Sequence, residues 1–298
     1  MTPIPITEVP HLPERSREGH KGSYGRVLIV AGGKGMSGAA VLCGRAALRG
    51  GAGLVQVATA ACVEPVVAAG NPCYMTFGIR QHADGSFSEG AGADLVEAGQ
   101  SATVLAIGPG LGRSESIKPM LRELIAGLPG VPVVLDADGL NAFAPFTDEF
   151  KDRPAPLILT PHPTEFARLN GTATLPEGED QRREQAVAFA ECFGVVLVLK
   201  GAGTIVTDGR RIYRNTTGNP GMATGGSGDV LTGLIAALIG QKLEPFDSAV
   251  LGVWLHGRAG DLAAGELGEV SLTAADLLER IPSAFVLGRE SEDDQLPF

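Results

Sequence analysis

Short apolar runs alternate with helix-like segments along most of the chain. The runs at 26–31 and 54–59 predict buried strands, and the small-residue segment 38–49 between them predicts a helix. The same alternation of strands, helices and turns continues through 103–112, 115–125, 131–143, 157–169, 180–193, 195–209 and 230–239. Strands that are apolar on both faces and separated by helices predict a three-layer α/β/α fold, with a central, mostly parallel sheet.

The alternation shows no break of the kind that separates domains, so we expect one domain over residues 1–298. Residues 1–21 predict an N-terminal arm. The charged segment 288–298 predicts a loose acidic tail, because it lacks apolar periodicity.

Polar and glycine-rich segments follow four of the predicted strands. They occupy residues 108–112, 136–138, 160–163 and 200–204. The ligands of open α/β sheets bind beyond the carboxyl ends of the strands, which share one edge. We therefore expect these four loops to converge on one site.

The segment 219–238, NPGMATGGSGDVLTGLIAAL, crowds Gly225, Gly226 and Gly228 together just before an apolar helix. A glycine turn that leads into a helix presents free N–H groups and the positive end of the helix dipole, which favour an anion such as phosphate. Asp229 could cap this helix, or it could take a proton from a hydroxyl group that attacks a bound phosphoryl group. The close glycines favour the second interpretation. Their spacing is not that of a Walker A loop.

Composition and charge narrow the classes of partner. The formal net charge of −10 disfavours nucleic acid and anionic membranes. The four cysteines show neither C-x-x-C spacing nor a neighbouring histidine cluster, so we expect reduced thiols, with neither disulfides nor metal ligands among the four. The sequence has no signal peptide and no stretch of roughly 18 apolar residues that could span a membrane. These features predict a cytoplasmic protein that acts on small molecules.

Six motifs stand in order within a likeness that covers roughly residues 22–278, and the first of them begins one residue earlier: KGSYGRVLIVAGGKGMSGAAVLCGRAALRGGAGLVQVAT, GPGLG, VVLDADGLNAF, LTPHPTEFARL, VLKGAGTIV and NPGMATGGSGDVLTG. Together they resemble the ADP/ATP-dependent NAD(P)H-hydrate dehydratases of the ribokinase-like superfamily. The resemblance implies repair of NADHX or NADPHX, the hydrated forms of NADH and NADPH, by nucleotide-dependent loss of water. It further implies that ADP, or alternatively ATP, is the co-substrate, that Mg²⁺ accompanies it, and that ADP yields AMP and phosphate.

The same resemblance implies roles for residues of the glycine turn and of the loop at 200–204. Asp229 would be the catalytic base, which also contacts the substrate. The transferring phosphoryl group would bind to Gly226, Ser227 and Gly228. The nucleotide would bind to Lys200, Gly201, Ala202, Gly203, Thr204 and Gly228.

Four further residues would contact the hydrated substrate by resemblance. His162 lies between two prolines, and Ala39, Ala40 and Gly110 would let the dinucleotide lie against the backbone. The alternatives are a structural histidine and close packing of a helix on the sheet.

Asp138 and Asn141 belong to the segment DGLNAF. They could position the substrate or a magnesium ion, or they could cap the helix. We favour capping for Asp138 and leave Asn141 open.

Many relatives carry a fused epimerase domain that interconverts the two epimers of the hydrate. Residues 1–21 are too few for such a domain, so we expect the chain to act on the S epimer and to work with a separate epimerase. The resemblance also implies a homotetramer.

The alternative is a small-molecule kinase of the same superfamily that acts on a thiazole or hydroxymethylpyrimidine. Such a kinase would share the glycine turn at 226–228 and the base Asp229. The joint presence of GPGLG, LDADGLN and TPHPTE favours the dehydratase. The intact base and turn disfavour a nucleotide sensor without activity. AGGKGMSG matches the dinucleotide fingerprint only loosely, and no acidic residue ends the next strand, which disfavours a Rossmann dehydrogenase.

Overall fold

The computed structural model describes residues 2–174 and 178–293 of the chain. Within these ranges, ten strands form one sheet in the order β1-β10-β9-β8-β7-β6-β5-β2-β3-β4. Their bounds are β1 (Ile4–Ile6), β2 (Arg26–Val30), β3 (Leu54–Ala60), β4 (Met75–Ile79), β5 (Val104–Ile107), β6 (Val133–Leu135), β7 (Leu157–Leu159), β8 (Val196–Leu199), β9 (Ile205–Thr207) and β10 (Arg211–Arg214).

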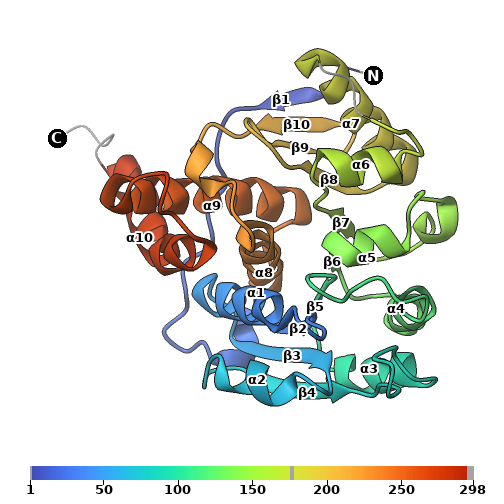
Figure 1. Ribbon diagram of the computed structural model, residues 1–298. Helices are drawn as coiled ribbons and strands as arrows, with labels where there is room; N and C mark the ends of the chain where they lie inside the picture. Colours follow the sequence, from blue (N-terminus) through green and yellow to red (C-terminus); the bar gives the residue numbers. More distant parts are fainter. Residues whose placement is uncertain (1, 175–177, 294–298) are drawn as a thin grey trace.

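Helices cover both faces of this sheet, which confirms the predicted three-layer α/β/α fold (Figure 1). One face carries α3 (Ala91–Gly99), α4 (Ile117–Gly127), α5 (Ala137–Ala142), α6 (Pro163–Leu169) and α7 (Glu179–Phe193). The other face carries α1 (Ser37–Arg49), α2 (Glu64–Ala69), α8 (Ser227–Gly240), α9 (Pro245–Leu267) and α10 (Ala274–Asp293).

The apolar runs of the strands serve two cores, one on each face. In β2, Leu28 and Val30 join the core beneath α3–α7, whereas Val27 and Ile29 join the core beneath α1 and α8. Alternate side chains of a strand point to opposite faces, so a central strand must be apolar throughout. This requirement explains the continuous apolar runs of the sequence.

Strand pairing is parallel from β8 to β4, and β9 runs antiparallel to both of its neighbours. The parallel strands β8, β7, β6, β5 and β2 are consecutive in the sheet. The loops that follow them therefore meet at one edge, as the sequence predicts.

The N-terminal arm contributes a strand that the sequence does not signal. Ile4, Pro5 and Ile6 pair in parallel with β10. Three residues, one of them a proline, are too few to show a period of two, and proline is tolerated in an edge strand.

The prediction of a loose tail from residue 288 is wrong for its first part, because α10 continues to Asp293. Leu277, Leu278 and Ile281 are buried and anchor the helix. Residues 288–293 contain no proline, so a helix anchored upstream can continue through them without apolar periodicity. Residues 294–298 of that prediction lie outside the described residues.

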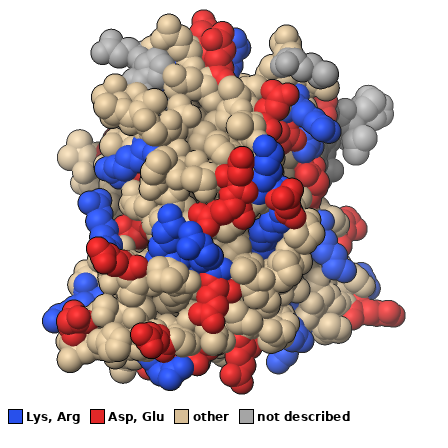
Figure 2. All heavy atoms as spheres, turned by 90° about the vertical axis from the view of Figure 1, so that its right-hand side faces the viewer, with Lys and Arg blue, Asp and Glu red and all other residues tan. Residues whose placement is uncertain are grey.

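None of the helices in the described ranges combines the length and the apolar character that crossing a bilayer requires. The face that carries α3–α7 mixes acidic and basic side chains (Figure 2).

Candidate active site

The glycine turn lies at the start of α8 and requires its glycine at position 226. Gly226 is the N-cap residue with a φ of 93°, and a Cβ atom there would lie 2.5 Å from Cδ1 of Leu42. In the described part of the chain, the N–H groups of Gly228 and Asp229 meet no backbone acceptor, and that of Ser227 lies 3.4 Å from the Thr224 oxygen. The N–H groups of Gly228 and Asp229 are therefore available to an anion at the positive end of the helix dipole, and that of Ser227 makes only a long hydrogen bond.

Asp229 occupies the first turn of α8 and does not cap it. The helix begins at Ser227 and has no side-chain hydrogen bond at its cap. Among the described residues, the Asp229 carboxylate has no hydrogen-bond or ion-pair partner. Burial, together with the nearby charge of Asp136 and, less strongly, Asp138, raises its pKa to about 7, against the opposing effect of Lys200. A carboxylate of this kind can accept a proton near neutral pH.

Asp136 lies at the end of β6 and is the most buried acidic residue of the site, with 1% of its surface exposed. Its Oδ1 atom accepts a hydrogen bond from Nζ of Lys200 at 2.7 Å, and its Oδ2 atom accepts one from Oγ1 of Thr232 at 2.8 Å. The sequence places Asp136 in a predicted loop but gives it no role. Its two partners lie 64 and 96 residues away along the chain, so no local motif could show them.

Lys200 extends from the end of β8 to the glycine turn. A Cβ atom at Gly228 would lie 3.1 Å from its Nζ atom. Burial lowers the pKa of Lys200, but the charges of Asp136, Glu165 and Asp229 outweigh burial and raise it. Lys200 is therefore a fixed cation beside the N–H groups of the turn, where it could also stabilise a phosphate.

The loop after Lys200 holds an exposed turn with its own hydrogen bonds. Oγ1 of Thr204 donates to the Gly201 oxygen at 2.9 Å, and Gly201 N donates to the same hydroxyl oxygen at 3.3 Å. Gly203 has a φ of 67°. Gly201 and Ala202 are exposed. The predicted nucleotide-binding residues thus line an accessible surface next to the turn.

His162 has a structural role in addition to any contact with substrate. It is the N-cap residue of α6, where its Nδ1 atom accepts from the N–H groups of Thr164 and Glu165 at 3.2 and 3.4 Å. The proton of the neutral ring is therefore on Nε2, which lies 3.4 Å from Oε1 of Glu165. Burial, followed by the charges of Lys200 and Arg168, lowers the pKa of His162. The His162 side chain is 47% exposed, so part of the ring is accessible from solvent.

The three small residues of the predicted substrate pocket differ in exposure. Ala40 is completely buried, and a Cβ atom added at Gly32 would lie 2.8 Å from the Cβ atom of Ala40. This close approach fits the alternative that Ala40 packs the helix against the sheet. Ala39 and Gly110 are partly exposed and lie together, since a Cβ atom at Gly110 would lie 2.9 Å from that of Ala39. The structure thus brings the start of α1 and the GPGLG loop into contact.

Asp138 does not cap α5, so that prediction is wrong. The N-cap residue is Asp136, and no side chain makes the capping bond. Oδ2 of Asp138 accepts instead from the Gly112 N–H at 2.8 Å, which joins α5 to the GPGLG loop. Asn141, left open by the sequence, accepts from Nη1 of Arg168 at 2.9 Å.

His256 of α9 is a site residue that the sequence does not indicate. Its Nε2 atom lies 2.9 Å from the Ser227 oxygen and 3.3 Å from the Ser227 hydroxyl. Burial lowers its pKa to about 4, so the ring is neutral and donates Nε2–H to the carbonyl. His256 therefore fixes the first residue of α8 from a helix that lies 29 residues further along the chain.

The carboxylates of the site do not fit a resident metal ion. Within the described ranges, no group of three or more His, Cys, Asp and Glu side chains is placed to hold one. Asp136 is occupied by Lys200 and Thr232, and Asp138 by Gly112.

Comparison with known proteins identifies the family. The family model described as NAD(P)H-hydrate dehydratase matches residues 27–283. The chain belongs to the NAD(P)H-hydrate dehydratase family. The predicted resemblance to the NAD(P)H-hydrate dehydratases is thereby confirmed, and the match covers most of the chain.

Individual relatives support the same conclusion. The bifunctional NAD(P)H-hydrate repair enzyme Nnr of Moorella thermoacetica is 47% identical over 273 residues, which are 91% of this chain and 51% of that protein. The chain thus spans about half the length of the curated relatives that it matches.

Solved structures agree in fold over nearly the whole chain. The ADP/ATP-dependent NAD(P)H-hydrate dehydratase of Bacillus subtilis, co-crystallised with ATP and Mg²⁺, has a TM-score of 0.79 and 34% identity, and the match covers 93% of this chain and 94% of that one. A ribokinase-like superfamily protein of Enterococcus faecalis V583 has a TM-score of 0.78 and 26% identity over 93% of this chain and 92% of its own.

Proposed function

We propose that the chain restores NADH and NADPH from the S epimers of their hydrates, with ADP as the co-substrate and AMP and phosphate as further products. The observation that carries the proposal is the unpaired Asp229 carboxylate. It has a pKa raised to about 7 and lies on the first turn of a helix whose N–H groups face the same space.

In the proposed reaction, Asp229 removes the proton of the ring hydroxyl group as its oxygen attacks the terminal phosphorus of the nucleotide. The bond from that phosphorus to the bridging oxygen breaks, and AMP departs. The N–H groups of residues 226–228 and the Lys200 ammonium would stabilise the charge on the transferring phosphoryl oxygens. Both groups are fixed before the reaction, because Asp136 holds the ammonium and His256 holds the turn.

The hydroxyl group is then a phosphate ester, which leaves more readily than hydroxide. The lone pair of the ring nitrogen expels it as phosphate by cleavage of the carbon–oxygen bond. Loss of a proton from the neighbouring ring carbon restores the dihydropyridine. The water of hydration thus leaves with its oxygen in phosphate, and the reaction needs neither an oxidant nor a reductant.

The nucleotide would lie along Lys200 and residues 201–204, with its terminal phosphate at the glycine turn. The accessible surface of the loop supports this placement. The Bacillus subtilis relative was co-crystallised with ATP and Mg²⁺, which supports a nucleotide co-substrate. Since the donor set does not fit a resident metal, magnesium would enter on the phosphates of the nucleotide. A homotetramer and a separate epimerase, both implied by resemblance, stay predictions.

The test follows the absorbance band of reduced nicotinamide after the protein is mixed with NADH hydrate, magnesium and either ADP or ATP. We expect the band to recover with ADP. Asp229→Asn should slow recovery by about 10²- to 10⁴-fold, the usual contribution of a general base, while it keeps the fold. If folded wild-type protein restores no NADH with either nucleotide, the proposed reaction is wrong, and a stable phosphorylated thiazole would indicate a kinase instead.

A further inference from the structure

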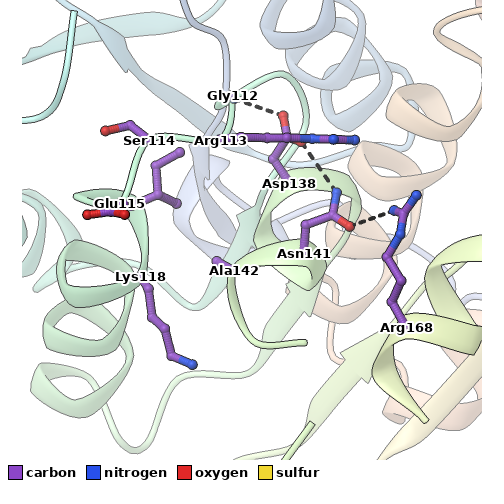
Figure 3. A pocket seen from close by; sticks show the side chains of 10 residues that line it. Gly112, Arg113, Ser114, Glu115, Lys118, Asp138, Asn141, Ala142 and Arg168 are labelled. Atoms are coloured by element: carbon purple, nitrogen blue, oxygen red, sulfur yellow. Dashed lines mark hydrogen bonds between the residues drawn. The ribbon is translucent and has the colours of Figure 1, made fainter. Parts of the chain in front are cut away.

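A cavity of about 430 Å³ opens beside Asp138, between the loop before α4 and the helices α5 and α6 (Figure 3). Gly112 and Asp138 line it, and they are joined by the hydrogen bond from the Gly112 N–H to Oδ2 of Asp138. Asp138 also acts on Asp229, since its charge contributes to the raised pKa of that residue. Gly112 also belongs to the GPGLG loop, whose Gly110 lies against Ala39, so the cavity adjoins the proposed substrate pocket.

Three cations line this cavity, namely Arg113, Lys118 and Arg168. Among the described residues, none of the three has an ion pair. Arg168 donates to the neutral Asn141 amide at 2.9 Å, and Nζ of Lys118 lies 5.7 Å from the centre of the Phe143 ring. Arg122, which lies on α4 as Lys118 does, is different because its Nε atom forms an ion pair with Oε2 of Glu149 at 2.8 Å.

The acidic residues of the lining do not neutralise these cations. Asp138 is held by Gly112, and Nδ2 of Asn141 lies 3.5 Å from its other oxygen. Glu115 lies across the cavity from Arg168 (Figure 3). The cationic side chains thus have unused hydrogen-bond donors, which are the groups that bind phosphate oxygens.

We infer that this cavity binds a phosphate group of the dinucleotide substrate, with Arg113, Lys118 and Arg168 as the residues that hold it. The inference rests on the proposed function. NADHX and NADPHX both carry a diphosphate between their two halves, and NADPHX carries a further phosphate on the adenosine ribose. With the nicotinamide ring at Asp229 and His162, the rest of the molecule extends past Asp138 into the cavity.

The nucleotide co-substrate does not explain these cations. Its expected site lies at residues 200–204, in the loop after β8, and at residues 226–228, where α8 begins. The cavity is lined from the loop before α4, from α4 itself, from α5 and from α6. A dinucleotide on one side of Asp229 and ADP on the other would bring the ring hydroxyl and the terminal phosphate together.

The test measures the dissociation constants of NADPH and NADH from the fluorescence of their reduced nicotinamide, and that of ADP by calorimetry. The variants are Arg113→Ala, Lys118→Ala, Arg168→Ala and their combination, with Arg122→Ala as the matched control. Each lost cation should weaken binding of the reduced dinucleotide by about tenfold or less, and the triple variant by considerably more than tenfold. Binding of ADP should not change, and Arg113→Lys should retain part of the affinity.

A loss that is equal for NADPH and NADH supports the diphosphate as the bound group, and a loss confined to NADPH supports the ribose phosphate. The inference is overturned if the triple variant binds both dinucleotides as the wild type does, if Arg122→Ala causes the same loss, or if only ADP binding weakens. Failure of the proposed function is distinguishable, because it would appear as an absence of NADH recovery by wild-type protein that still binds NADPH through the cavity.

Discussion

Two carboxylates at the centre of the site, the buried Asp136 just after β6 and the partly buried Asp229 at the start of α8, have opposite surroundings. Asp136 accepts hydrogen bonds from Lys200 and Thr232, whereas Asp229 has no hydrogen-bond or ion-pair partner in the described residues. A paired carboxylate can hold its neighbours in place but has no free oxygen for an incoming proton. An unpaired one retains that capacity. The hydrogen-bond partners of each carboxylate therefore distinguish the proposed base from the positioning residue.

The largest expected effect comes from breaking the pair at Asp136. Asp136→Asn leaves the Lys200 ammonium without its anion, and we expect the free energy of unfolding to fall by about 3 to 5 kcal/mol. Urea unfolding measures the change. The double variant Asp136→Asn with Lys200→Met should lose less than the sum of the single variants, because no unpaired charge remains. Equal additive losses would show that the two residues do not stabilise the fold as a pair.

Asp229→Asn should have the opposite effect on stability, and only at higher pH. Since the pKa of Asp229 is about 7 in the fold and near 3.8 when unfolded, the native state binds more protons between these values. The wild type therefore loses stability as the pH rises from about 4 to 7, whereas the Asn variant does not. We compare the free energy of unfolding of the variant with that of the wild type at two pH values. Above pH 7 the difference should favour the variant by roughly 2 to 4 kcal/mol more than it does at pH 4. A difference that is constant with pH would contradict the raised pKa.

Gly226 and Gly225 offer a smaller and matched comparison at the turn itself. Gly226→Ala forces a side chain into a positive φ and against Leu42, so we expect a loss of about 1 to 3 kcal/mol and a raised KM for ADP. Gly225→Ala meets nothing within 4 Å and should cost little. Thermal unfolding and steady-state kinetics measure both. Equal effects at the two positions would show that the conformation of the turn is not the determining factor.

The smallest change is expected for Thr232→Val, which removes one donor to Asp136 and keeps the volume. We expect a loss of about 1 kcal/mol in the free energy of unfolding, since a single hydrogen bond is removed while the Lys200 pair persists. Urea unfolding measures this change as well. A loss as large as that of Asp136→Asn would mean that the threonine, and not the lysine, holds the carboxylate.

The sequence predicts those parts of the fold and site that local pattern determines. The layers follow from apolar runs, and the turn at Gly226 and Asp229 follows from adjacent glycines before a helix. The pairing of Asp136 with Lys200 and the contact of His256 with Ser227 join distant segments, so a single sequence gives no signal for them. Asp138 was expected to cap α5 because of its place in the chain, but the neighbouring GPGLG loop supplies a better-placed N–H group.

The pH dependence of kcat/KM for NADPHX at saturating ADP tests most directly whether the unpaired Asp229 is the base. Activity should rise with pH along an acid limb whose apparent pKa is near 7, because Asp229 must be ionised to accept the proton. In Asp136→Asn the nearby negative charge is absent, so this limb should move to lower pH. A limb near the ordinary range of an aspartate, about pH 4, or one that stays in place in the variant, would contradict the account.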